Sequence, residues 1–159
     1  IKAPDEFLEK QVKEFDFSTM DPGEISKNMI DVMHKYKGVG LAANQVGVDA
    51  QIFVMGEKDP MTVINPIITE VSTEKVEMEE GCLSFPGLYM KVNRPSVVSV
   101  QYLDIEQKEC IIKLEGFHAR VFLHEYDHLQ GITFDQRVSK LRLEMAKKKQ
   151  EKLLKGLHG

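Results

Sequence analysis

Apolar residues recur at two different spacings along this chain of 159 residues, and these spacings predict helices and strands. Between residues 21 and 37 they lie three and four positions apart, the period of a helix with one buried face. Asp21 and Pro22 are typical of a helix start, the first as N-cap and the second at the first helical position. Gly38 should end this helix. Its predicted buried face consists of Ile25, Met29, Val32, Met33 and Tyr36.

Between residues 51 and 114 the pattern changes to short runs rich in β-branched residues. Clusters of Gly, Pro, Asn and Asp separate these runs, as is typical of strands joined by turns. The sequence therefore predicts six strands, at residues 51–55, 62–64, 67–71, 75–79, 97–103 and 110–114.

Two further helices are expected toward the C-terminus. In residues 116–130 the apolar side chains fall nearly all round the helix, which predicts a helix buried between sheets. Together the elements predict an α+β fold: short, mostly antiparallel β-sheets around a central buried helix, with an N-terminal and a C-terminal helix. We expect residues 1–159 to form a single domain. The last helix, 141–157, is amphipathic, with apolar positions at Leu141, Met145, Leu153, Leu154 and Leu157.

Composition and charge narrow the classes of partner. The net charge is −4, yet residues 140–159 carry seven Lys or Arg against two Glu, so the rest of the chain sits near −9. An acidic body argues against DNA binding, whereas the basic C-terminal helix is either a solvated face or a contact for an anionic partner. No apolar run approaches the roughly 20 residues of a membrane helix. We expect a cytoplasmic, organelle stroma or matrix, or (for a phage-encoded protein) host-cytoplasm location, with both cysteines reduced.

The central helix carries side chains with metal-binding chemistry. His124-Glu125-Tyr126-Asp127-His128 is an H-E-x-x-H pattern. Residues four positions apart lie on one face of a helix, so His124 and His128 can bind one metal ion, and Glu125 can reach a water beside it. The alternative is two histidines that only pack inside a buried helix.

A third ligand is needed, because catalytic metal sites in hydrolases usually use three protein ligands. The third histidine of one protease class would fall at position 134, which is Phe134. Glu144 and Cys110 are candidates, although a solvated helix face and a buried strand are the simpler interpretations. Cys82 follows Gly81 at a predicted strand end, where its side chain can point at a neighbouring helix, and a thiolate is a strong metal ligand.

A small-residue loop, Gly38–Gln45, follows the first helix and is almost uncharged. Its G-x-G-x-x-A spacing matches a dinucleotide-binding turn. That turn follows a strand and opens a helix, whereas this loop follows a helix and precedes a strand, so we exclude a nucleotide site. Small residues let a backbone approach a ligand closely, which makes Gln45 a candidate binding residue.

Three motifs together resemble the signatures of peptide deformylases, in the order and at the spacing of that family. The matching linking segments extend the resemblance to nearly the whole chain, and the continuation after the cysteine motif is most similar to the bacterial, plastid and phage branch. The motifs are Gly38–Gln45 (GVGLAANQ), Glu80–Ser84 (EGCLS) and His124–Leu129 (HEYDHL), and the other matching segments are Asn65-Pro66, Phe85–Tyr89 and Val92–Pro95.

One position departs from the family pattern. The residue before the H-E-x-x-H motif is commonly Gln in this family, and here it is Leu123. On the helical wheel Leu123 points away from His124 and His128. We therefore expect altered packing and intact chemistry.

The resemblance implies a metal site and a mechanism. Cys82, His124 and His128 would bind one divalent metal ion, physiologically Fe(II), which Zn, Ni or Co can replace. Glu125 would accept a proton from water and deliver it to the departing amine. The Gln45 side chain and the backbone N–H of Leu83 would donate to the oxyanion.

The resemblance also implies the substrate, the formyl-methionine end of newly made proteins, from which formate is released. Phe117 and Val121 share the helix face of the metal-binding histidines, and Val39 and Leu88 could complete an apolar substrate pocket, with core packing as the alternative for Leu88. Gly40 would also contact the substrate. The backbone of residues 38–40 would pair with the peptide as an added strand. We expect a monomer without DNA or membrane partners, and possible ribosome contact through the basic helix. Two alternatives remain: an H-E-x-x-H zinc metallopeptidase using Glu144, and a non-catalytic metal module.

Overall fold

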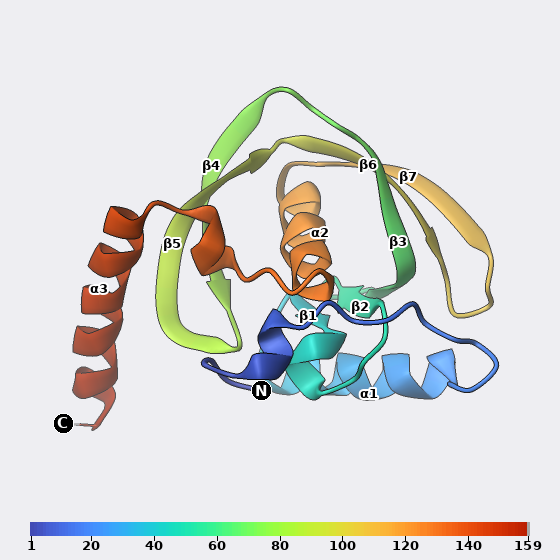
Figure 1. Ribbon diagram of the computed structural model, residues 1–159, viewed down its shortest axis with the longest axis horizontal. Coiled ribbons are helices and arrows are strands. Elements are labelled where there is room, and N and C mark those ends of the chain that lie inside the picture. The colour runs from blue at the N-terminus through green and yellow to red at the C-terminus, as the bar shows by residue number, and fades with distance from the viewer. Residues whose placement is uncertain (159) are drawn as a thin grey trace.

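The computed structural model describes the backbone of residues 1–158 and the side chains of residues 1–156 (Figure 1). Within these residues the chain forms three α-helices and seven strands. The α-helices are α1 (Pro22–Lys35), α2 (Gly116–Leu129) and α3 (Lys140–His158). Three short 3-10 helices are η1 (Glu6–Glu9), η2 (Ala43–Val46) and η3 (Phe134–Arg137). Within the described part of the chain no helix has the length and apolarity needed to cross a membrane.

The strands form two antiparallel sheets, which confirms the predicted α+β class. The larger sheet has the order β1-β2-β3-β6-β7, and the smaller one pairs β4 with β5. Figure 1 shows α2 in the middle of the molecule, with strands of both sheets around it, α1 below the larger sheet and α3 beside β5. The strand bounds are β1 Gly40–Ala42, β2 Ile52–Met55, β3 Met61–Val71, β4 Lys75–Cys82, β5 Phe85–Pro95, β6 Val97–Leu103 and β7 Glu109–Glu115.

Helix α2 is buried, as its pattern predicts. Ten of its 14 residues are buried, and Phe122 packs edge-on against Phe53 of β2 with ring centroids 5.1 Å apart. Leu123, at the position where the family commonly has Gln, is 7% exposed and belongs to the same apolar core. An apolar side chain there removes a polar group that would need a partner inside the core.

The strand predictions were partly wrong. Residues 85–95 were not among the predicted strands, yet they form β5, in which Leu88, Met90 and Val92 alternate inward. The Pro and Gly residues at both ends of this segment hid that alternation. The two strands predicted at 62–64 and 67–71 are one strand, because Asn65 adopts a left-handed φ of 50° and lets β3 continue through a bulge.

The ends and buried faces of the helices also differ in part from the prediction. Asp21 caps α1 by accepting bonds from the backbone N–H groups of Gly23 and Glu24, as expected. Tyr36 was expected to be buried, but α1 ends at Lys35 and Tyr36 is 58% exposed.

The predicted apolar face of α3 was partly wrong. Leu141, Met145 and Leu153 are exposed, whereas the predicted Leu154 docks together with Leu143 and Ala146, which were not predicted. Ala146, 7% exposed, shares a buried apolar cluster with Leu88, Met90 and Val92 of β5. The side chain of Leu157 lies outside the described residues.

Candidate metal centre

Three side chains of ligand type converge where α2 faces the end of β4. One ligand atom from each of Cys82, His124 and His128 lies within 4.8 Å of the other two. The Cys82 Sγ and His128 Nε2 atoms are 3.4 Å apart. A tetrahedral ion bonded at about 2.3 Å to sulfur and 2.0–2.1 Å to nitrogen holds such atoms about 3.5 Å apart, so the arrangement fits a first-row metal ion.

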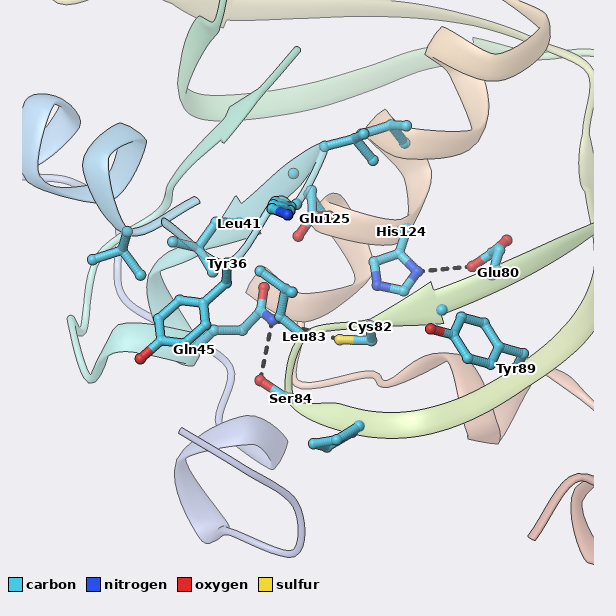
Figure 2. Close-up of a pocket in the computed structure, with 18 of the residues that line it drawn as sticks. Tyr36, Leu41, Gln45, Glu80, Cys82, Leu83, Ser84, Tyr89, His124 and Glu125 are labelled. Atoms are coloured by element: carbon cyan, nitrogen blue, oxygen red, sulfur yellow. Dashed lines mark hydrogen bonds and ion pairs between the residues drawn. The ribbon is translucent and has the colours of Figure 1, made fainter. Parts of the chain in front are cut away.

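A carboxylate orients His124 by bonding the ring nitrogen that faces away from Cys82. Its Nδ1 lies 2.7 Å from Oε1 of Glu80, which leaves Nε2 directed toward Cys82 (Figure 2). Ligating histidines in proteins usually have such a partner, because it fixes the tautomer and the ring orientation. Glu80 is 6% exposed, and it belongs to the same strand as Cys82.

Buried arginines hold this carboxylate in its charged form. Arg94 donates to both Glu80 oxygens, at 2.6 and 3.1 Å, and Arg120 donates to Oε2 at 2.7 Å. Burial alone would raise the pKa of Glu80, but the hydrogen bonds with His124 and Arg94 lower it to about 2. Arg94 also bonds Asp127 of α2 at 2.8 Å, so one guanidinium joins β4 to α2.

The two histidines have opposite tendencies to protonate. Burial would lower the pKa of His124, but hydrogen bonding with Cys82 and Glu80 and the charge of Glu125 raise it to about 10. Burial and the charge of His124 lower the pKa of His128 well below its ordinary value. Without a metal ion, a proton is therefore favoured on His124 and disfavoured on His128.

Glu125 is a buried carboxylate at the edge of the centre. It is 4% exposed, and its Oε1 has no hydrogen-bond partner within the described residues. Burial, the largest effect, raises the pKa of Glu125 to about 7. Gly40 makes room for it, because a Cβ at position 40 would lie 2.5 Å from the Glu125 Oε2 atom. The buried carboxyl group is thus suited to exchanging protons near neutral pH.

Gln45 reaches the centre from η2. Its Nε2 donates to Ser84 Oγ at 3.1 Å and lies 3.5 Å from Cys82 Sγ, as Figure 2 shows. Its Oε1 accepts from the backbone N–H of Ala42, which fixes the orientation of the amide. An amide nitrogen carries two N–H groups, so one can hold Ser84 while the other points toward a ligand beside the sulfur.

A cavity of about 1040 Å³ opens onto this centre. Its wall combines the 38–41 loop, the end of β4 with the turn after it, and one face of α2. Nine of the ten predicted site residues lie along this wall; the tenth, His128, is fully buried behind it. The nine are Val39, Gly40, Gln45, Cys82, Leu83, Phe117, Val121, His124 and Glu125.

The alternative ligands lie outside the cluster. Glu144 is exposed on α3 and Cys110 is half-buried on β7, and neither belongs to the cluster of ligand-type side chains found among the described residues. The supporting charges Glu80, Arg94 and Arg120 were not predicted as site residues. A charged residue at an inward position of a strand, as Glu80 is, was the available signal.

Fold and candidate centre together fit a class: an α+β metallohydrolase in which an H-E-x-x-H helix faces a cysteine from a separate strand. The sequence model of the polypeptide deformylase family matches residues 1–144. The chain belongs to the peptide deformylase family.

Relatives and solved structures agree with this assignment. The chain is 42% identical to a peptide deformylase of Aquifex aeolicus over 159 residues, covering 96% of this chain and 94% of that protein. It is 40% identical to peptide deformylase 1B, chloroplastic, of rice, covering 87% of this chain but spanning only 54% of the rice protein. A crystal structure of peptide deformylase from Plasmodium falciparum superposes with a TM-score of 0.88 at 35% identity, covering 98% of this chain and 95% of that one.

Proposed function

We propose that this protein removes the formyl group from the N-terminal formyl-methionine of newly made proteins by metal-dependent hydrolysis, releasing formate. The observation that carries the proposal is the convergence of three ligand atoms, a buried carboxyl group and an oriented amide on one cavity. Membership of the peptide deformylase family supports the same reaction.

Cys82, His124 and His128 would hold one divalent metal ion. We propose Fe(II) as the physiological ion, with Zn, Ni or Co as substitutes, since a thiolate and two imidazoles suit several first-row ions. When bound, such an ion lowers the pKa of water and polarises a carbonyl group.

Glu125 is the proposed proton carrier. Its carboxylate faces the cavity next to His124, and its pKa of about 7 in the metal-free protein allows it both to accept and to return a proton. It takes a proton from the attacking water and delivers it to the amine nitrogen as the formamide C–N bond breaks. Acid–base transfer of this kind typically contributes about 10²–10⁴-fold to the rate.

Gln45 and Leu83 are the proposed donors to the developing oxyanion. The Gln45 amide is fixed by Ala42 and Ser84, so little reorganisation is needed when charge appears on the formyl oxygen. The backbone N–H of Leu83 follows Cys82 directly in the turn after β4. Removing one donor of this type typically costs about 2.7–4 kcal/mol of barrier.

The cavity offers an apolar wall for methionine. Phe117 and Val121 lie on the α2 face that carries His124, and Val39, directly before β1, lines the same cavity. Phe117 is 54% exposed, so a methionine side chain that enters the cavity can bury part of the apolar surface of its ring. Gly40 begins β1, an outer strand of the larger sheet, where a peptide backbone can add as a further strand.

The two other classes have less support. A metallopeptidase would need Glu144 as a ligand, but this residue is exposed on α3. A structural metal site usually closes with four protein ligands, whereas the group found among the described residues supplies three.

Product analysis tests the proposal. Protein loaded with Fe(II) under exclusion of oxygen is incubated with a formyl-Met tripeptide and with its unformylated counterpart. We expect stoichiometric formate and free Met-peptide from the first substrate and no product from the second. Cleavage of a peptide bond without formate would refute the assignment in favour of a metallopeptidase.

We also propose a ribosome contact by a monomeric, single-domain protein. The outer face of α3 presents Lys148, Lys152 and Lys155 beside exposed Met145, which suits an RNA surface. Replacing the three lysines by Glu should abolish ribosome binding at low salt while leaving formate release intact. Unchanged ribosome affinity of this variant would rule out the contact. The cellular compartment expected above stays a prediction.

A further inference from the structure

The C-terminal half of α3 lies beyond the part of the chain that the family sequence model matches, which ends at residue 144. It nevertheless packs along β5, the strand that returns from the cysteine turn (Figure 1). The inner face of α3 therefore contacts the strand that follows the Cys82 turn, whereas its basic outer face is exposed.

The strand that α3 contacts contains a bulge directly after the cysteine turn. Cys82 pairs with Phe85, but the neighbouring Gly81 pairs with Tyr89. Residues 86–88 thus have no register partner on β4, and the β-ladder does not fix their conformation. Bulges next to active sites commonly re-aim a side chain, and this one sets how the turn with Cys82 and Leu83 is presented.

Helix α3 supplies what the ladder lacks. The Gln150 Nε2 donates to the backbone carbonyl of Pro86 at 2.9 Å. Gly87 has a left-handed φ of 77°, and the Gln150 Cγ and the Leu154 Cδ2 lie 3.6 and 3.7 Å from the position its Cβ would occupy. Both Pro86 and Gly87 also line the substrate cavity.

A second apolar cluster continues this support to the metal ligands. Leu88 of the bulge, Ala146 of α3 and Phe134 of η3 form part of it, and Cys82 packs against it. The Phe134 ring lies 5.6 Å from the ring of His124. Helix α3, the bulge and two of the three ligands are therefore in one continuous packed unit.

We infer that Gln150 is a positioning residue for the deformylation site: by holding the 86–88 bulge it fixes the turn that presents Cys82 and the Leu83 backbone N–H. The inference rests on the proposed deformylase function. Gln150 touches neither metal nor substrate, so its loss should disturb geometry and leave the centre assembled.

The test compares three variants. Gln150→Glu keeps the shape of the side chain but removes the N–H donor, Gln150→Lys keeps a donor, and Lys148→Gln makes the same charge change as the first on the exposed face. For Gln150→Glu we expect kcat for formate release to fall about 3- to 10-fold, the scale of one net hydrogen bond, with KM changed less than about twofold. Gln150→Lys should recover most of the loss, and Lys148→Gln should match the unsubstituted protein.

A spectroscopic readout separates positioning from folding. In the Co(II)-loaded protein without substrate, the thiolate-to-cobalt absorption reports the geometry at Cys82, and it should shift in Gln150→Glu alone while the thermal midpoint stays unchanged. Unaltered kcat and spectrum in Gln150→Glu would overturn the inference. So would a rate loss that follows a lowered midpoint without a spectral shift. Absence of formate release by the unsubstituted protein would instead refute the proposed function.

Discussion

Gly40→Ala tests whether the position of Glu125 is set by the loop that faces it. A Cβ built at Gly40 lies 2.5 Å from Glu125 Oε2, 2.9 Å from Cδ and 3.0 Å from Cγ. Unstrained contacts of this kind are about 3.5–4.0 Å, so the carboxyl group must retreat by about 1 Å. Gly40 is not among the residues with positive φ, so alanine brings no left-handed backbone strain, and the nearest atoms that its Cβ meets belong to Glu125.

A displacement of about 1 Å at a reacting group can cost roughly 10²-fold in rate. We therefore expect kcat/KM for a formyl-Met peptide to fall about 10²-fold in Gly40→Ala, measured as formate release. The metal content should stay at one ion per chain, since Cys82, His124 and His128 are untouched. Gly156→Ala is the matched control, because nothing lies within 4 Å of a Cβ at that position. Wild-type turnover of Gly40→Ala would refute the idea that the 38–41 loop fixes Glu125.

Three further predictions concern the supporting charges and the ligands. Glu80→Gln removes the carboxylate that pairs with His124, Arg94 and Arg120, and leaves Asp127 as the counter-charge of Arg94. We expect about 3–5 kcal/mol lower stability in denaturant and 10–100-fold weaker metal binding, and near-wild-type values for both would contradict the role given to Glu80. Cys82→Ala should lose stoichiometric metal in elemental analysis while Cys110→Ala keeps it, and the reverse result would reassign the ligand. In the metal-free protein the lowered pKa of Glu80, about 2 against an ordinary 4.5, stabilises the fold above pH 4.5, and this contribution is lost as the pH falls toward 2. The thermal midpoint of the unsubstituted protein should therefore drop more steeply between pH 4.5 and 2 than that of Glu80→Gln. Equal slopes would contradict stabilisation by ionised Glu80.

Sequence patterns predicted the parts of this molecule that depend on local periodicity. The H-E-x-x-H helix, its burial and the cap at Asp21 follow from spacing within a few residues. Strand β5 escaped prediction because Pro86-Gly87 at its start and Pro95 at its end are turn signals, while its inward residues find their partners on α3. Local propensity does not contain that tertiary contact.

The candidate site was predicted to about the same extent as the fold. The three proposed ligands and Glu125 emerge from motifs, although Cys82 lies far from α2 in sequence and spacing alone left its place open against Cys110 and Glu144. The charges behind them were missed because each acts through a long-range pair. Arg94 joins Glu80 of β4 to Asp127 of α2, and only the folded chain brings these together. For the same reason the positions of the leucines in α3 did not predict its whole docking face.

The most direct test of the central claim is a comparison of Glu125→Gln with the unsubstituted protein, both loaded with the same metal ion and both analysed for metal content and formate release. The substitution keeps size and removes the proton-accepting carboxylate beside an intact set of ligands. We predict one metal ion per chain in both proteins and a loss of at least about 10²-fold in formate release by the variant. A metal-replete Glu125→Gln protein that releases formate at the unsubstituted rate would contradict the mechanism.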